Sequence, residues 1–94
     1  MIICNCSFKS ETTDMRDFYH GLDQEGFISG FRADNGNLKY DFYISCDDPR
    51  SMILIEKWET IEDLQEHSSS DLFAKFRPFC KLNSVKSGLE MYEE

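Results

Sequence analysis

Residues 52–55, Met-Ile-Leu-Ile, form the longest apolar run of the chain and set the strongest constraint on its fold. The run lies within residues 51–58, which have the length of a β-strand and end at Trp58. Because successive side chains of a strand point to opposite faces of a sheet, an unbroken apolar run predicts that both faces of this strand are covered. Any fold for the chain has to supply those two coverings.

Three other segments show the two-residue alternation that is typical of strands, namely residues 2–8, 38–46 and 85–92. In the first of them, Asn5 falls on the opposite face from Cys4 and Cys6, and we expect it on a sheet face. A short polar connection joins the strand at 38–46 to the strand at 51–58. These two strands are therefore expected to pair as a hairpin.

A helix is expected between the first two strands. Thr12 or Thr13 is a candidate N-cap, and apolar residues then follow helical spacing as far as Leu22. The apolar pattern resumes about one residue out of phase after Gly26, which predicts a break or a bulge at that glycine. Turn residues at 35–37 indicate that the helix ends near Arg32.

A second helical region follows the strand at 51–58. Thr60 and Asp63 match a capping box, in which the Thr60 hydroxyl accepts from a free backbone N–H and Asp63 reaches back. This pattern predicts a short helix that ends at His67. Three serines interrupt it, and another helical segment is expected over residues 71–77, ending around Pro78.

The resulting order, β-α-β-β-α-(α)-β over residues 1–94, predicts one α+β domain with the ferredoxin-like split β-α-β arrangement. Its four-stranded antiparallel sheet would carry helices on one face and leave the other face open. The apolar run at 52–55 nevertheless requires a second covering. A homodimer with the two sheets face to face supplies it most simply.

Composition excludes several classes of partner. The formal charge of -8 would repel phosphate backbones, so we expect no nucleic acid partner. The apolar run is far shorter than the roughly 20 residues that span a bilayer, and no export signal is recognisable, so a cytoplasmic protein that binds no membrane is expected. The four cysteines are then expected to be reduced, and Cys4-x-Cys6 without a second Cys/His pair nearby predicts no metal site.

Trp58 is the only tryptophan and His67 is one of two histidines, and they lie nine residues apart. His67 could transfer protons near neutral pH, Trp58 could form a flat pocket wall with an N–H donor, and Asn5 could orient a substrate oxygen. Structural roles compete with these interpretations: Trp58 as core, His67 as a helix C-terminal charge, and Asn5 paired with backbone. His20 and the scattered acidic residues are interpreted as solvent-facing groups.

Three motifs, Gly36-Asn37-Leu38-Lys39-Tyr40, Leu54-Ile55-Glu56-Lys57-Trp58-Glu59 and Leu64-x-x-His67, together with the order of elements, resemble the antibiotic biosynthesis monooxygenase family. The similarity covers nearly the whole chain and is greatest to the quinol monooxygenase branch. It implies a dimeric α/β barrel. Where such proteins often continue to Ser-x-His-Phe, this chain has Leu72 in place of the second histidine.

The resemblance implies a cofactor-independent monooxygenase that oxidises a small electron-rich phenol or quinol with molecular oxygen. It implies His67, Trp58 and Asn5 as catalytic residues, and Tyr40 and Asn37 as substrate-binding residues. No flavin, haem or metal would be needed, because a deprotonated phenol or hydroquinone can itself give an electron to oxygen.

Two alternatives remain at this point. Haem-degrading enzymes of the same fold are similar in using an Asn, Trp and His set in which the histidine ligates iron, although a charge of -8 suits a dianionic porphyrin poorly. The other alternative is a non-catalytic dimer that binds a small molecule, or an isomerase-like relative, because the fold alone does not determine function.

Overall fold

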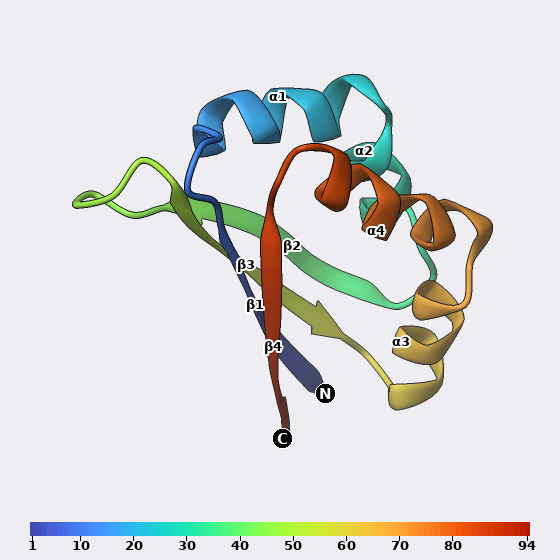
Figure 1. The fold of residues 1–94 in the computed structure, drawn as a ribbon. Helices are drawn as coiled ribbons and strands as arrows, with labels where there is room; N and C mark the ends of the chain where they lie inside the picture. The colour runs from blue at the N-terminus through green and yellow to red at the C-terminus, as the bar shows by residue number, and fades with distance from the viewer.

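The computed structural model describes residues 1–94 and contains four strands and four helices (Figure 1). In chain order these are β1 (Ile2–Lys9), α1 (Met15–Gln24), α2 (Phe27–Arg32), β2 (Asn37–Ile44), β3 (Ser51–Trp58), α3 (Ile61–Ser68), α4 (Asp71–Leu82) and β4 (Lys86–Glu93). This order confirms the predicted β-α-β-β-α-(α)-β pattern.

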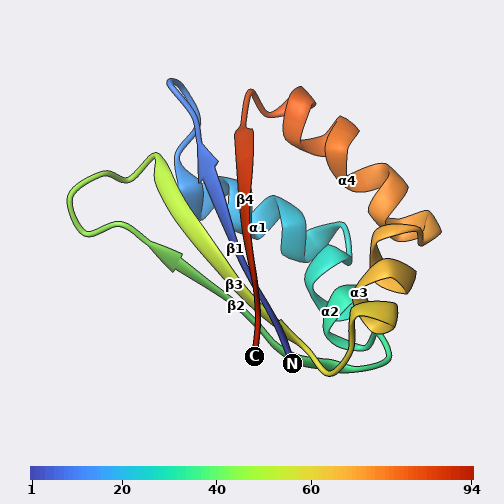
Figure 2. The same ribbon diagram turned by 90° about the horizontal axis from the view of Figure 1, so that it is seen from below.

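The four strands form one antiparallel sheet in the order β2-β3-β1-β4, so β3 and β1 are central and β2 and β4 are the edges. All four helices lie on one face of this sheet (Figures 1 and 2). The architecture is the predicted ferredoxin-like α+β fold. No helix of the structure is long and apolar enough to cross a membrane.

The register of β1 and β3 determines which side chains face the helices. Ile2 pairs with Trp58 and Phe8 pairs with Met52, so every second residue of both strands is directed into the core. This inward face carries part of a core of 16 buried apolar residues. They are Ile2, Cys4, Phe8, Met15, Phe18, Leu22, Phe27, Ile28, Phe31, Tyr40, Met52, Leu54, Trp58, Phe76, Cys80 and Val85.

The first helical region breaks at Gly26, as predicted. Gly26 has a φ of 81°, which ends α1 and begins α2 in the left-handed region that glycine adopts readily. The predicted N-cap is wrong by one or two residues, because the Asp14 carboxylate accepts the N–H of Arg16 and caps α1. The Thr13 hydroxyl instead donates to the backbone oxygen of Asn83 at 2.6 Å.

The second helical region contains two further corrections. Thr60 caps α3 by accepting the N–H of Asp63 at 3.1 Å, but the Asp63 carboxylate accepts from Asn35 instead of reaching back to Thr60. Helix α4 does not end around Pro78 and continues to Leu82. Proline removes one helical hydrogen bond, and the packing of the next residue, Phe79, against the α1–α2 region offsets that loss.

The face of the sheet opposite the helices is uncovered in the single chain (Figure 2). In β3, Met52 and Leu54 are buried beneath the helices, whereas Ile53 on the other face is 37 % exposed. Its cross-strand neighbour Tyr43 and the β4 residue Tyr92 are also exposed. The apolar run therefore has one covered face and one open face.

Two glycines with positive φ provide a matched test of what positions α3. Gly36 has a φ of 78°, and a Cβ there would overlap the Asp63 side chain, whereas a Cβ at Gly26 meets nothing. Gly26→Ala should cost about 1–2 kcal/mol of unfolding free energy from conformation alone. Gly36→Ala should cost about 1–3 kcal/mol more because of the overlap. Urea unfolding of both variants measures the difference, and equal losses would contradict the role of the Asp63 contact.

Candidate functional site

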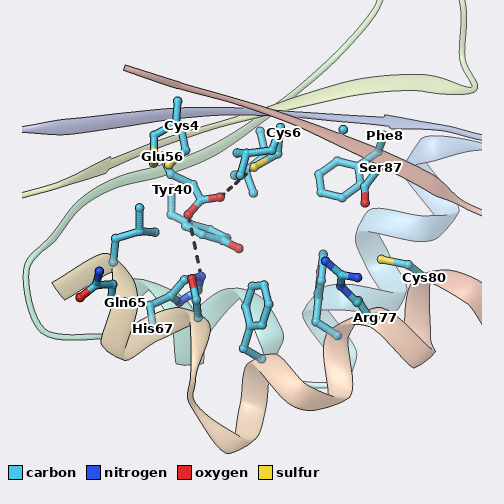
Figure 3. Close-up of a pocket in the computed structure, with 18 of the residues that line it drawn as sticks. Cys4, Cys6, Phe8, Tyr40, Glu56, Gln65, His67, Arg77, Cys80 and Ser87 are labelled. Atoms are coloured by element: carbon cyan, nitrogen blue, oxygen red, sulfur yellow. Dashed lines mark hydrogen bonds and ion pairs between the residues drawn. The ribbon is translucent and has the colours of Figure 1, made fainter. Parts of the chain in front are cut away.

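A cavity of about 720 Å³ lies between the sheet and helices α3 and α4 (Figure 3). Its volume is in the range of sites for drug-sized ligands. Twelve of its 20 lining residues are hydrophobic. The lining residues that concern its chemistry are Cys4, Cys6, Tyr40, Glu56, His67 and Arg77.

Glu56 is a buried carboxylate within the apolar core, with only 6 % of its surface exposed. Its Oε1 accepts from the Trp58 indole Nε1–H at 3.0 Å, and its Oε2 accepts from the Cys6 thiol at 3.0 Å. Such donors are needed because a buried charge without partners is costly. Burial and the negative charge of Glu56 raise the pKa of the Cys6 thiol, which keeps this donor protonated.

His67 lies next to this carboxylate and is 3 % exposed. Its Nδ1 is 2.7 Å from Asp34 Oδ2, and its Nε2 is 3.8 Å from Glu56 Oε1. An ionised carboxylate only accepts hydrogen bonds, so the proton of the Asp34 contact lies on Nδ1, and in the neutral form of the ring Nε2 is the acceptor. The imidazole is thus oriented as a proton acceptor, because Asp34 fixes both its tautomer and its plane.

The segment after α2 docks on α3 and places Asp34 against His67. Gly36 turns the chain with positive φ, and its backbone oxygen accepts the N–H of Glu59 at 2.8 Å. Asn35 donates to Asp63 in the first turn of α3. These two hydrogen bonds fix the start of α3 against residues 35–36, and the helix then carries His67 over the end of β3.

Three further cavity groups remain protonated in the folded chain. Burial, followed by the charge of Glu56, raises the pKa of Tyr40 well above its usual range, and Figure 3 shows its hydroxyl directed into the cavity. Burial also raises the pKa of Cys4 to about 11 and that of Cys80 to about 11. These groups can donate hydrogen bonds at neutral pH, and their thiols are poor nucleophiles there.

Three of the five residues proposed from the sequence, His67, Tyr40 and Trp58, come together, and the two asparagines do not. His67 and Tyr40 line the cavity. Trp58 is fully buried behind them, where its ring packs on His67 at a centroid distance of 4.6 Å, so it supports the site and does not form its wall.

The two asparagines lie outside the cavity. Asn5 pairs with Ile55 in the sheet register and so faces the uncovered side, because strand alternation puts it opposite Cys4 and Cys6. The expectation that Asn5 converges with Trp58 and His67 is therefore wrong. Asn37 donates to the Lys39 backbone oxygen at an irregularity of β2 and does not line the cavity.

Sequence reasoning missed Glu56 and Asp34 by assigning all acidic residues to solvent. A signal for Glu56 was present, because it alternates with Met52, Leu54 and Trp58 on the inward face of β3. A charged residue in that register predicts a buried, functional or hydrogen-bonded group. Asp34 gives no comparable local signal, because its partner lies 33 residues away.

No group of three or more His, Cys, Asp or Glu side chains in the structure is arranged to hold a metal ion. Asp34 is hydrogen-bonded to His67, whose other ring nitrogen lies 3.8 Å from Glu56, and Glu56 accepts in turn from Trp58 and Cys6. This arrangement suits proton transfer to and from an aromatic ligand.

Trp58→Phe should lower the unfolding free energy by about 2–4 kcal/mol, because it removes the donor to Glu56 and leaves unfilled volume beneath His67. Urea unfolding measures the loss. Tyr43→Phe, on the uncovered face, is the control and should change stability by less than about 0.5 kcal/mol. An unchanged stability of the Trp58 variant would contradict the supporting role of this indole.

Comparison with solved structures shows the same fold in other proteins. A putative antibiotic biosynthesis monooxygenase from Deinococcus radiodurans superimposes with a TM-score of 0.87 at 16% identity, covering 100% of this chain and 92% of the other. One of the same description from Nitrosomonas europaea gives 0.79 at 19% identity, covering 100% and 98%. A conserved protein of unknown function from Bacteroides thetaiotaomicron gives 0.84 at 18% identity, covering 99% and 96%.

Sequence comparison establishes the family. No curated protein matches the chain significantly. The family model for antibiotic biosynthesis monooxygenases matches residues 22–78, which include Asp34, Tyr40, Glu56, Trp58 and His67. The match spans more than half of the 94 residues. The chain therefore belongs to the antibiotic biosynthesis monooxygenase family.

Proposed function

We propose that this protein is a cofactor-independent monooxygenase that oxidises a small electron-rich phenol or quinol with molecular oxygen. The observation that carries the proposal is the orientation of His67. Its Nδ1 is held by Asp34 at 2.7 Å, and its ring lines a largely apolar cavity of about 720 Å³. A fixed imidazole in such a cavity is well suited to removing the proton of a phenolic hydroxyl.

The reaction balances without an external reductant. A quinol and one molecule of oxygen give a hydroxyquinone and one molecule of water, so one oxygen atom enters the ring and the other leaves as water. The two electrons that reduce the second oxygen atom come from the quinol itself. Removal of the hydroxyl proton starts the sequence, because the phenolate gives an electron to oxygen far more readily than the phenol does.

Each residue at the site has a separate role in this reaction. His67 Nε2 accepts the phenolic proton, while the Asp34 carboxylate stabilises the imidazolium that forms. The charge of Glu56, 3.8 Å from Nε2, also favours that imidazolium. Tyr40, whose raised pKa keeps it protonated, can donate to an oxyanion of the ligand.

His67→Ala should reduce oxygen uptake at least 100-fold with every quinol that the wild type oxidises, because general-base catalysis contributes about 10²–10⁴-fold. The measurement is oxygen consumption across a panel of hydroquinones. Oxygen uptake by Asp34→Asn should lie between that of the wild type and that of His67→Ala, because the amide still supports the imidazole ring but does not stabilise its positive charge. His20→Ala, an exposed histidine on α1, is the matched control and should retain full activity.

Failure of the wild type to consume oxygen with any quinol would refute the proposed reaction. Retained quinol binding in that case would favour the binding-dimer alternative. Titration with haemin tests the other alternative, a haem-degrading enzyme. Haem ligation by His67 is not expected, since Nε2 faces the Glu56 carboxylate and Nδ1 is engaged by Asp34. A Soret shift that is lost in His67→Ala would contradict that expectation.

We also propose that two copies of the chain associate through the uncovered sheet faces. The support is the exposure of Ile53, Tyr43 and Tyr92 on the face of the sheet that no helix covers. Large apolar and aromatic side chains exposed on one face of a sheet are typical of association sites. A two-fold arrangement would give the apolar run at 52–55 its second covering.

Ile53→Lys should shift the protein toward monomer, because the two-fold interface would bury two unpaired charges, one from each chain. Sedimentation at micromolar concentration distinguishes the 11.0 kDa chain from its dimer. Leu82→Lys is the control, since Leu82 is 82% exposed at the end of α4, away from the sheet. A wild-type protein that sediments as a monomer would refute the association.

A further inference from the structure

Arg77 is the only lysine or arginine among the 20 residues that line the cavity. It lies on α4, and its side chain extends from that helix into the space beneath the sheet (Figure 3). The chain as a whole carries a formal charge of -8. An exposed guanidinium at an apolar cavity of such an acidic protein is positioned to bind an anionic ligand.

No residue of the chain supplies that partner. The ion pairs of the structure involve Arg32, Lys39 and His67, and none involves Arg77. Its positive charge does reach the cavity wall, because it lowers the pKa of the Cys80 thiol against the larger raising effect of burial. Arg77 is therefore an unpaired guanidinium whose field acts inside the site.

The charged groups of the cavity are separated along its length. Glu56 and His67 lie together at one end, beneath β1 and β3, and Arg77 lies toward the other end near Cys80 and Ser87 (Figure 3). Apolar side chains, including Phe8, Leu54 and Phe76, also line the cavity. A complementary ligand has a hydroxyl donor at one end, an aromatic middle and an anion at the other end.

We propose that the site takes an aromatic acid, a phenol or quinol that carries a carboxylate, and that Arg77 binds this carboxylate. This inference rests on the proposed function, because it places the reacting hydroxyl at His67 and Glu56. A guanidinium matches a carboxylate with two parallel hydrogen bonds, so Arg77 fixes the orientation of the ring as well as its charge. A neutral quinol would leave the guanidinium without an anion.

The test compares a dihydroxyphenylacetate with its methyl ester, which share the ring and both hydroxyls and differ in charge. Calorimetric titration of the wild type should show about tenfold tighter binding of the acid, the usual scale for a charge-assisted contact. Arg77→Gln should remove this preference and leave binding of the ester unchanged. Arg77→Lys should retain part of the preference for the acid, because an ammonium group keeps the positive charge but lacks the planar pair of N–H donors that a guanidinium offers.

Lys75→Gln is the matched control, because Lys75 is an exposed cation on the same helix that does not line the cavity. It removes one positive charge and should keep the full preference for the acid. Arg77 is exposed as well, so its variants are expected to fold, and urea unfolding verifies this. The acid preference should also shrink as salt is raised, whereas ester binding should not.

Equal affinity for the acid and the ester, or a preference that survives in Arg77→Gln, would overturn the inference. If the ester is oxidised as well as the acid in both proteins, the proposed oxidation holds and the role of Arg77 is refuted. If the acid binds in an Arg77-dependent way and no oxygen is consumed, acid recognition holds and the proposed oxidation is refuted. Tighter binding of the corresponding aryl phosphate than of the acid would overturn the choice of carboxylate.

Discussion

The buried carboxylate of Glu56 is the interaction on which the rest of the site depends. An ionised group in an apolar core is tolerated only where donors surround it, and here the Trp58 indole and the Cys6 thiol supply them at 3.0 Å. These donors come from β3 and β1, whose pairing is fixed along their full length. His67 is then packed on Trp58 and directed at the same carboxylate. The sheet register and the geometry of the candidate site are thus parts of one arrangement.

The helices cover the strands of the sheet unequally, and this leaves an opening to the cavity. Helices cover β2, β3 and β1 on one face, whereas the edge strand β4 has Leu89 and Met91 on that side and both remain more than half exposed. Both residues line the cavity, so the cavity opens along β4 while its polar end lies deep against β3. A ligand entering from this edge would reach Arg77 and Ser87 near the opening and His67 at the inner end. The opening of the cavity and its buried polar groups therefore lie at different ends of the same space.

Local patterns in the sequence predicted the elements well where a single segment decides the outcome. Strand alternation, the break at Gly26 and the Thr60 cap depend on neighbouring residues only, and all three are present. The errors occur where distant residues compete. Thr13 bonds to Asn83 across the fold and leaves the cap to Asp14. Helix α4 passes through Pro78 because packing against another helical region outweighs one lost hydrogen bond.

The sequence by itself determined the fold class and the alternation of each strand, and it supplied His67 as a candidate proton acceptor, because periodicity and side-chain chemistry are local properties. It also contained the inward position of Glu56, which the alternation of β3 specifies. Only the tertiary structure decided which polar groups meet. Asp34 and His67 are 33 residues apart, and Cys6 and Glu56 are 50 apart, so chain folding alone brings them into contact. For the same reason Asn5, chemically suited to the site, was excluded from it: pairing with β3 turned its side chain to the opposite face of the sheet.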